Sequence, residues 1–501
     1  MPIWKAAPPE LPAPPPIRPV ESLAGKHVHL IGVGGIGMSA IARLLQSMGC
    51  LVSGCDAAHS EITDALARDG VDIFIGHSPS HVVEGEDANP KADMVIISAA
   101  VRDTNPELRS ARQADIAVLK YAQALGWLTR GRDVIAVAGS HGKTTTSSMI
   151  AFAHNRAGLN PSMVIGGMVP QLGGNSCTGA GGPFVVEACE FDRSFLNLTP
   201  KAAVIANVDR DHLDYYRGGI EELIEAFGSF AGQVADDGLV VVNGDDPHAV
   251  RAGKRATARV QTFGEGTHCD WRISDCARAD GVTRFRVHHG ARNLGVFQLS
   301  IPGFYNVRNA MACIAICEHF GVNRQDVREA LLEFAGAKRR FDRLGEAGGV
   351  TVVDDYGHHP TEVRVTLEAA RNEFPLRRVW CVFQPHQYSR TRMLLEDFGR
   401  AFGSADRVIV PDIHAARDNA SDRASVHSRD LVRQLRLNGV EAEYGSELPD
   451  TLQRLLDVVQ RGDVVMTMGA GPVDGVARDL LAGLRKREEA KETADGLVLR
   501  V

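Results

Sequence analysis

Short apolar runs alternate with helix-like segments along most of the chain. The run at residues 134–138 (VIAVA) is continuous, which is typical of a strand buried on both faces of a parallel sheet. A helix-like segment follows and stops at Gly158, and a similar pair stands at residues 27–49. Further strands are expected at residues 50–57, 72–76, 93–98, 183–187, 204–208, 350–356, 377–384, 407–413 and 463–469, and a further helix at 307–321. Strands that alternate with helices predict an α/β fold with parallel sheets.

The alternation begins near residue 26 and restarts near residues 131 and 341. A chain of 501 residues is long enough for about three domains of ordinary size. We therefore expect a Rossmann-like domain at 25–130, a central P-loop ATPase-like domain with a parallel sheet at 131–337, and a second Rossmann-like domain at 338–485. Residues 1–24 form a proline-rich leader that is expected to be disordered, and 486–501 a charged, solvated helix end.

Composition narrows the class of protein. The net charge is −7 with 23% charged residues, so no basic surplus indicates nucleic acid or an anionic membrane as a partner. The chain contains neither an apolar run long enough to span a membrane nor a signal peptide. Its nine cysteines include no C-x-x-C pair, so buried reduced thiols in the cytoplasm are expected, rather than a disulfide framework or a zinc knuckle.

A glycine turn that carries Lys and Thr joins the strand at 134–138 to its helix. Backbone N–H groups and the helix N-terminus can face a phosphate there, while Lys143 adds a point charge and Thr144 offers its hydroxyl to Mg²⁺. The first glycine of G-x-x-x-x-G-K-[ST] is replaced by Val137, so the motif is a shortened variant. A glycine turn without a ligand is the alternative. The pattern favours ATP binding by Gly139, Ser140, His141, Gly142, Lys143, Thr144 and Thr145.

A second glycine turn stands in the N-terminal part of the chain. Gly32, Gly34 and Gly37 form G-x-G-x-x-G between a strand and a helix, and Asp56 ends the next strand. This is the dinucleotide fingerprint, in which the glycines approach a diphosphate and the carboxylate accepts from ribose hydroxyls. Read alone it indicates NAD. A UDP-sugar presents the same pair of phosphates, so a nucleotide-activated substrate is equally compatible beside a separate ATP loop.

Acidic and imidazole groups follow the strands of the central domain. Glu187 comes directly after an apolar run, and His212 lies among aspartates in residues 207–214. Carboxylate and hydroxyl oxygens beside a phosphate loop are what Mg²⁺–ATP chemistry needs, because the hard cation prefers oxygen ligands. His212 is a less usual ligand, and a hydrogen-bonded surface cluster is its alternative interpretation.

Eight blocks of sequence then carry a resemblance to a known family. From about residue 26 to 485 the chain resembles the Mur ligases, which are ATP-dependent amide-bond-forming enzymes of peptidoglycan synthesis. Among them it is most similar to those that join L-alanine to UDP-N-acetylmuramate. The blocks are HLIGVGGIGMSAIA (29–42), AGSHGKTTT (138–146), VVEACEFDRSFL (185–196), NVDRDHLDYY (207–216), PGFYNVRNA (302–310), KRRFDRLG (338–345), VVDDYGHHPTE (352–362) and FQPHQYSRTR (383–392).

The resemblance implies ATP and Mg²⁺ as cofactors, and a monomer or weak homodimer. It assigns catalytic roles to Lys143, Glu187, His212 and Arg340, and a metal site to Thr144, Glu187 and His212. It assigns further ATP contacts to Asn306, Asn309, Arg340 and Asp355, and amino-acid contacts to Tyr356, His358, His386 and Arg390. It assigns the UDP diphosphate to Gly32, Gly34, Gly35, Gly37 and Asp56.

Three positions depart from the family pattern. Cys189 replaces an aspartate near the expected metal, Tyr305 replaces a histidine next to the adenine-contacting asparagine, and Gln387 replaces an arginine near the amino-acid site. Several sister ligases carry a carbamylated lysine in the central domain, whereas this chain has no lysine between Lys201 and Lys254. The alternatives left open are a ligase that recycles a tripeptide onto the same sugar nucleotide, an NAD-dependent oxidoreductase and a non-catalytic nucleotide switch.

Overall fold

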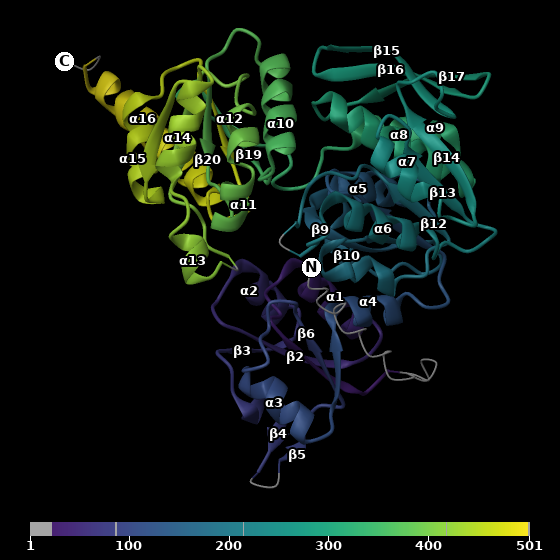
Figure 1. Ribbon diagram of the computed structural model, residues 1–501. Helices are drawn as coiled ribbons and strands as arrows, with labels where there is room; N and C mark the ends of the chain where they lie inside the picture. Colours follow the sequence, from purple (N-terminus) through teal and green to yellow (C-terminus); the bar gives the residue numbers. More distant parts are fainter. Residues whose placement is uncertain (1–22, 86–87, 214, 417, 499–501) are drawn as a thin grey trace, which may run out of the picture. The chain divides into compact units, whose positions relative to one another are not determined.

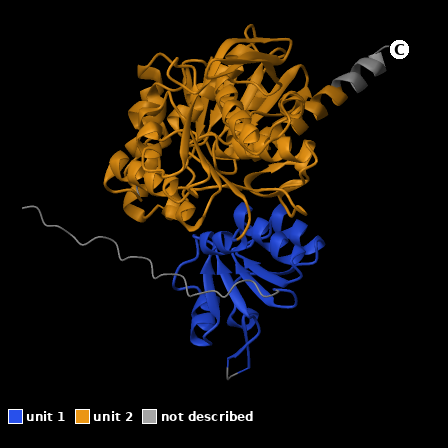
Figure 2. Cartoon of the chain, turned by 90° about the vertical axis from the view of Figure 1, so that its right-hand side faces the viewer, with its two compact units in different colours: residues 1–130 blue, residues 131–501 orange. Residues whose placement is uncertain are grey.

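The computed structural model describes residues 23–85, 88–213, 215–416 and 418–498. The chain forms two compact units, Met1–Arg130 (unit 1) and Gly131–Val501 (unit 2), which Figure 2 shows in blue and orange. Unit 2 contains two sheets. We call residues 131–337 its central part and residues 338–498 its C-terminal part.

Unit 1 is a five-stranded parallel sheet in the order β3-β2-β1-β6-β7 (Figure 1). Its elements are β1 (His27–Ile31), α1 (Ile36–Ser47), β2 (Leu51–Asp56), α2 (Glu61–Arg68), β3 (Asp72–Ile75), η1 (Pro79–His81), β4 (Val83–Glu84), β5 (Asn89–Pro90), β6 (Met94–Ile97), α3 (Pro106–Gln113), β7 (Ala117–Lys120) and α4 (Tyr121–Leu128). Apolar residues of β1 and β6 form the core with α3. The order reverses beside β1, and such a switch point leaves a crevice at the carboxyl ends of the strands.

The central part of unit 2 carries a ten-stranded sheet in the order β10-β9-β11-β8-β12-β13-β14-β15-β16-β17. Its elements are β8 (Val134–Ala138), α5 (Lys143–Arg156), β9 (Ser162–Val169), η2 (Pro170–Leu172), β10 (Gly174–Cys177), β11 (Phe184–Glu187), η3 (Phe191–Asn197), β12 (Ala202–Ile205), α6 (Gly219–Ala231), β13 (Leu239–Asn243), α7 (Pro247–Gly253), β14 (Arg259–Gly264), β15 (Trp271–Ala279), β16 (Val282–His289), β17 (Arg292–Leu299), α8 (Phe304–His319) and α9 (Arg324–Glu333). The sheet is parallel from β9 to β15, and β8 is buried along its whole length. The carboxyl ends of β11, β8 and β12 therefore lie side by side.

The C-terminal part carries a six-stranded sheet in the order β18-β19-β23-β20-β21-β22. Its elements are β18 (Asp342–Ala347), β19 (Val350–Asp355), α10 (Pro360–Glu373), β20 (Val379–Phe383), α11 (Tyr388–Met393), α12 (Leu395–Gly399), β21 (Arg407–Pro411), α13 (Ala420–Arg423), α14 (Ser428–Leu437), β22 (Ala442–Ser446), α15 (Leu448–Val458), β23 (Val464–Met468) and α16 (Asp474–Val498). Only β18 is antiparallel to its neighbour. Separate apolar clusters pack on the two faces of the sheet, as a doubly wound α/β layer requires.

The predicted α/β class with three domains is confirmed, and the predicted strands are parallel and mostly buried, except for the exposed edge strand β3. The sequence analysis did not find the antiparallel edges of the central sheet, where β10 pairs with β9 and β15, β16 and β17 form a meander. In β15 the pattern breaks into alternation and then into exposed positions at 275–277, because one side of this extension faces solvent. Such strands lack the apolar run that marked the others.

The ends of the chain are only partly described. The leader predicted at 1–24 lies outside the described residues except for 23 and 24, and the charged tail continues α16 as far as Val498. None of the nine cysteines, all of which lie in described segments, forms a disulfide. In the described part of the chain, no helix combines the length and apolar character that a bilayer crossing needs.

Candidate functional site

The phosphate turn predicted after β8 closes onto its own helix and onto α8. Gly139 and Gly142 adopt φ of 147° and 82°, which a side chain rarely tolerates. A Cβ on Gly142 would lie 2.6 Å from Asn309 Oδ1, so the turn must be bare where α8 approaches. The Lys143 ammonium donates to the Ser140 carbonyl at 3.2 Å and forms an ion pair with Glu190 Oε2 at 2.9 Å. The turn therefore combines helix N-terminal amides with a buried cation.

The carboxylate of Glu190 compensates the positive charge of Lys143. Its side chain is 1% exposed, and its other oxygen lies 3.7 Å from His212 Nε2. Burial alone would lower the pKa of Lys143, but the charges of Glu190 and its neighbours outweigh burial and raise it. Lys143 consequently stays protonated, as a group that compensates phosphate charge must.

Thr144 and Glu187, two of the three predicted metal ligands, are in contact. The Thr144 hydroxyl donates to Glu187 Oε2 at 2.9 Å, and the Gly166 amide donates to the same oxygen at 2.8 Å. Arg340 Nη2 donates to Thr144 Oγ1 at 3.3 Å from the C-terminal part. A hydroxyl and a carboxylate beside a phosphate turn form a donor set that fits Mg²⁺. His212, the third predicted ligand, has its Nε2 3.7 Å from both Glu190 Oε1 and Asp211 Oδ2.

Cys189 stands between Glu187 and Glu190 in the sequence. Desolvation, followed by the charge of Glu190, raises the pKa of the Cys189 thiol to about 12. The thiol is therefore neutral and does not replace the missing carboxylate. Glu190 supplies the second negative charge of this segment.

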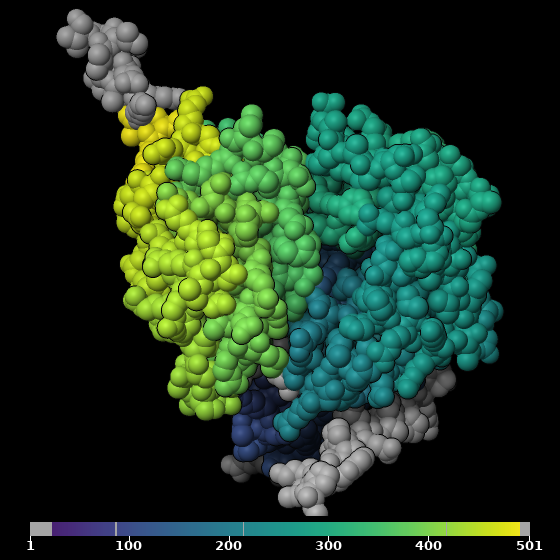
Figure 3. Space-filling model, turned by 45° about the horizontal axis from the view of Figure 1, so that its top comes forward, coloured from purple at the N-terminus to yellow at the C-terminus, as the bar shows by residue number. Residues whose placement is uncertain are grey.

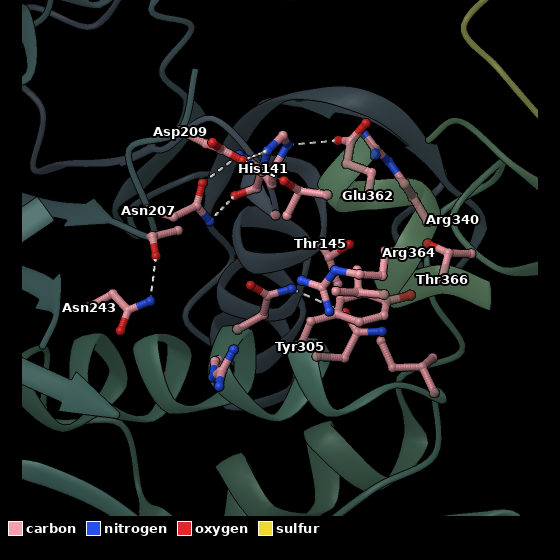
Figure 4. Close-up of a pocket in the computed structure, with 18 of the residues that line it drawn as sticks. His141, Thr145, Asn207, Asp209, Asn243, Tyr305, Arg340, Glu362, Arg364 and Thr366 are labelled. Atoms are coloured by element: carbon pink, nitrogen blue, oxygen red, sulfur yellow. Dashed lines mark hydrogen bonds and ion pairs between the residues drawn. The ribbon is translucent and has the colours of Figure 1, made fainter. Parts of the chain in front are cut away.

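A cavity of about 350 Å³ opens beside the phosphate turn and is lined by both parts of unit 2 (Figure 4). The central part contributes lining residues that include Tyr305, Asn306 and Asn309. Asn309 Nδ2 donates to Asn306 Oδ1 at 3.1 Å. Tyr305 places an aromatic ring where the family pattern has histidine. Figure 3 shows the teal central surface and the green C-terminal surface of unit 2 meeting along a furrow. A cavity lined by amide groups and by the rings of Phe263 and Tyr305 suits a planar base.

Arg340 and Asp355 line the same cavity from the C-terminal part. The Asp355 carboxylate accepts from the backbone amides of Phe341 and Gly357, at 2.8 and 2.7 Å. Burial raises the pKa of Asp355 to about 6, although Arg340 opposes the shift. Both predicted residues are thus within reach of a ligand in the cavity.

His141 links the phosphate turn to the C-terminal part. Its Nε2 lies 3.1 Å from Asp209 Oδ2 and its Nδ1 3.1 Å from Glu362 Oε1, as Figure 4 shows. Burial would lower the pKa of His141, but the charge of Glu362 and the bond to Asp209 outweigh it and raise the pKa to about 10. The Thr361 hydroxyl also donates to Asp209 Oδ2, at 2.6 Å. His141 is therefore a buried cation that holds two carboxylates from different parts of unit 2.

The four residues predicted to contact an amino acid gather in the C-terminal part, on the loops after β19 and β20 and on α11. The ring centroids of Tyr356 and His358 are 5.4 Å apart, those of His358 and His386 are 5.9 Å apart, and Arg390 Nη1 lies 3.4 Å from His386 Nδ1. Arg390 Nη2 donates to Asp211 Oδ1 of the central part at 2.8 Å, and both side chains are buried. Burial lowers the pKa of His358 to about 4, so its ring is neutral. Asp211 therefore pairs with the guanidinium of Arg390, one of the residues predicted to contact the amino acid.

The glycine turn of unit 1 forms around Asp56. Gly32 adopts φ of 83°, and the Gly34 amide donates to Asp56 Oδ2 at 2.9 Å. A Cβ on Gly34 would lie 2.8 Å from that oxygen, and one on Gly37 would lie 2.8 Å from the Tyr121 ring. Gly35, the fourth predicted glycine, is the N-cap of α1. The glycines are therefore needed for close packing as well as for access to the turn.

Known proteins were compared with this chain. Three domain models match: Mur ligase family, catalytic domain, at residues 27–133; Mur ligase middle domain at 137–317; and Mur ligase, glutamate ligase domain, at 339–471. A UDP-N-acetylmuramate–L-alanine ligase of Alkaliphilus metalliredigens is 40% identical over 459 residues, which cover 91% of this chain and 97% of the relative. The chain belongs to the Mur ligase family.

Other Mur ligases agree in sequence and in structure. The UDP-N-acetylmuramate–L-alanine ligase of Geobacter sulfurreducens is 39% identical over 92% of this chain and 98% of its own. The crystal structure of UDP-N-acetylmuramate–alanine ligase MurC from Thermotoga maritima superimposes with a TM-score of 0.78 at 28% identity, covering 93% of this chain and all of that one. A murein peptide ligase from Psychrobacter arcticus shares the fold, with a TM-score of 0.69 at 23% identity.

The sequence analysis missed several residues of this Mur ligase site. They are Glu190, Asn207, Asp209, Asp211, Thr361 and Glu362. All of them stand inside the quoted sequence blocks, next to residues that were chosen. The signal that could have found Asn207 and Asp209 is their place directly after β12, the strand beside the phosphate-turn strand. Glu362 and Thr361 carried no such signal, because only the packing of α10 brings them to His141.

Proposed function

We propose that this protein joins L-alanine to the carboxylate of UDP-N-acetylmuramate with hydrolysis of ATP, forming UDP-N-acetylmuramoyl-L-alanine, ADP and phosphate. The observation that carries the proposal is the identity of 40% and 39%, over nearly the whole length of each chain, to two relatives named for this reaction. The site supports it, because the phosphate turn with its largely buried lysine lies beside Arg340 of the C-terminal part. ATP and a nucleotide-linked sugar as substrates place the enzyme in the cytoplasm.

The first step activates a poor acyl donor. A carboxylate does not expel oxide, so the sugar carboxylate attacks the γ-phosphorus of ATP and becomes an acyl phosphate, while ADP leaves. Lys143 and the amides of the turn stabilise the charge on the transferring phosphoryl group. Arg340 reaches the same place through Thr144, and its pKa is raised because the charges of Glu362 and Asp355 outweigh burial. Arg340 therefore remains a fixed cation at the phosphates.

Thr144 and Glu187 would hold a Mg²⁺ ion. The contact between Glu190 and His212 lies close to this pair, beside the phosphate turn. Mg²⁺ bound there would supply positive charge to the phosphate oxygens. The chain offers no lysine for carbamylation in this region, since Lys201 pairs with Asp237 at the start of β12 and the next lysine is Lys254. We infer that oxygen ligands, phosphate oxygens and water complete the site without a carbamate.

The second step forms the amide bond. The amine of L-alanine attacks the acyl phosphate carbon, and the tetrahedral intermediate collapses with loss of phosphate. Arg390 would bind the alanine carboxylate after exchanging its partner Asp211, while the neutral ring of His358 adds no charge against the ammonium group. Gln387 is 4% exposed and its backbone bonds to His414, so it offers no second guanidinium. The alanine carboxylate can pair with Arg390 only when Asp211 releases the guanidinium, so alanine binding depends on Asp211.

The glycine turn of unit 1 would bind the UDP diphosphate. Asp56 accepts from the Gly34 amide, so a nucleotide that uses this amide must take over that bond. An assembled site that excludes water protects the acyl phosphate from hydrolysis.

ADP and phosphate release by the full chain tests the proposal. Release should require ATP, UDP-N-acetylmuramate and L-alanine together, and the product should gain the mass of one alanine residue. The matched comparison supplies L-serine, glycine or the tripeptide of the recycling ligases in place of L-alanine. Faster turnover with the tripeptide would favour that alternative, and NADH-dependent absorbance changes would favour an oxidoreductase.

A further inference from the structure

Four potential metal ligands that the ligase reaction does not use converge in unit 1. His29 comes from β1, Cys55 from β2, His81 from the end of η1 and Glu107 from α3. One ligand atom of each lies within 4.8 Å of all the others. His29, Cys55 and Glu107 are fully buried, and the side chain of His81 is 14% exposed. We call these four residues the unit 1 cluster.

Glu107 is the centre of the cluster. Its Oε1 accepts from the Ser78 amide at 3.0 Å and lies 2.5 Å from His81 Nδ1. Its Oε2 accepts from the Cys55 thiol at 2.7 Å and lies 3.6 Å from His29 Nε2. A carboxylate without exposure to solvent is costly unless its charge is compensated. In this unit the compensation comes from a thiol, an amide and imidazoles.

A relay of hydrogen bonds orients His29. The Lys91 carbonyl can only accept, so His27 Nδ1 donates to that oxygen at 2.6 Å. The Ser53 hydroxyl bridges the two rings, at 2.8 Å from both His27 Nε2 and His29 Nδ1. The other ring nitrogen, His29 Nε2, is buried and has no hydrogen-bond partner. It lies 3.6 Å from Glu107 Oε2, so the relay aims this nitrogen at the carboxylate.

We propose that the unit 1 cluster is a binding site for Zn²⁺ or a similar borderline divalent ion, held by His29, Cys55, His81 and Glu107. Two imidazole nitrogens, one thiolate and one carboxylate oxygen are a donor set that Zn²⁺ takes in tetrahedral geometry, with ligand atoms about 3.3–3.8 Å apart. The His29–Glu107 separation already has this value. Binding forms a Zn–S bond and releases the Cys55 thiol proton to solvent.

The donor set and the orientation of its parts favour this site over others in the protein. Ser53 forms a hydrogen bond with His29 Nδ1, and such a bond to the other ring nitrogen orients a metal-binding histidine. A second cluster of Asp245, His268 and Cys269 is more open, and its His268 Nε2 already bonds to the Gly244 carbonyl. The Thr144–Glu187 pair offers oxygen only and suits Mg²⁺. A metal bound by Cys55 would also stabilise the glycine turn of unit 1, because the Cys55 carbonyl accepts from the Gly32 and Val33 amides.

Cobalt titration of the full chain in excess Mg²⁺ tests the proposal, because Co²⁺ is a spectroscopic substitute for Zn²⁺. We expect one Co²⁺ per chain with a near-ultraviolet sulfur-to-cobalt charge-transfer band, one proton released per ion, and loss of the band when Zn²⁺ is added. Cys55→Ser should abolish the band while retaining a hydroxyl that can donate to Glu107. His29→Gln should weaken binding by at least about tenfold. Zn²⁺ should raise the melting temperature of the wild type by more than that of Cys55→Ser or His29→Gln.

Two matched variants keep the test specific. Cys269→Ser removes the thiol of the second cluster, and Cys50→Ser removes another buried thiol of unit 1, which bonds to the Leu23 carbonyl. Both should keep the cobalt band. A band that persists in Cys55→Ser, disappears in Cys269→Ser, or is absent from the wild type would overturn the proposal. So would a melting temperature that Zn²⁺ raises equally in the wild type and in folded His29→Gln.

Discussion

Replacing Lys143 separates its role in catalysis from its role in folding. The Lys143 side chain is 14% exposed, and its ammonium lies 2.9 Å from a carboxylate oxygen of Glu190, whose side chain is 1% exposed. Lys143→Met keeps the aliphatic length and removes the charge. It therefore leaves the buried Glu190 carboxylate without its ammonium partner, with the His212 ring 3.7 Å away. One substitution should thus reduce both activity and stability.

The two effects have different sizes. At an effective dielectric constant of about 20, charges separated by 2.9 Å attract by about 6 kcal/mol before desolvation is counted. Breaking a buried pair by removing one partner costs about 3–5 kcal/mol, so Lys143→Met should lower the free energy of unfolding by roughly 3 kcal/mol. Losing a charge contact to the transferring phosphoryl group should lower kcat by on the order of 10²-fold or more.

A double variant distinguishes the two effects. Lys143→Met with Glu190→Gln removes both charges, and should recover most of the lost stability in a urea titration while ADP release remains at the low level. The single variant Glu190→Gln is the matched control for the carboxylate. The reasoning is refuted if Lys143→Met turns over within a few-fold of wild type, or if the double variant regains activity together with stability.

Three further predictions address the metal, the sugar nucleotide and pH. Glu187→Gln should raise the Mg²⁺ concentration needed for half-maximal activity, while depletion of bicarbonate leaves the wild type unchanged; reactivation by added bicarbonate would contradict the absence of a carbamate. Gly34→Val pushes against Asp56, where a Cβ would lie 2.8 Å from the carboxylate, so KM should rise for UDP-N-acetylmuramate and stay constant for ATP; equal effects would count against the assignment. Because the pKa of His141 is raised from 6.5 to about 10, the protonated ring contributes its full stabilisation of the folded state below pH 6.5. This contribution is lost as the pH rises through 10. The free energy of unfolding should fall over this range in the wild type and less in His141→Gln, and parallel curves would refute this.

Residues that act through local backbone geometry could be predicted from sequence. The phosphate turn is recognisable because Gly139, Gly142 and Lys143 must stand between one strand and one helix. Glu187 could be predicted from the sequence for a similar reason, because it ends the strand next to the strand that leads into that turn. His212 shows the limit of this reasoning, because its place in a block of acidic residues does not specify which carboxylate it faces. The structure places it beside Glu190 and Asp211.

The sequence by itself determined the α/β class, the two glycine turns and the residue types available for nucleotide chemistry. These depend on periodicity, apolar runs and turn residues, which act over a few positions. Only the tertiary structure decided that Arg390 pairs with Asp211 and that His141 joins Asp209 to Glu362, over 179, 68 and 221 positions of chain. It also brought His29, Cys55, His81 and Glu107 together from four elements. Such meetings depend on how sheets and helices pack, and packing places residues according to the fold rather than according to their neighbours in sequence.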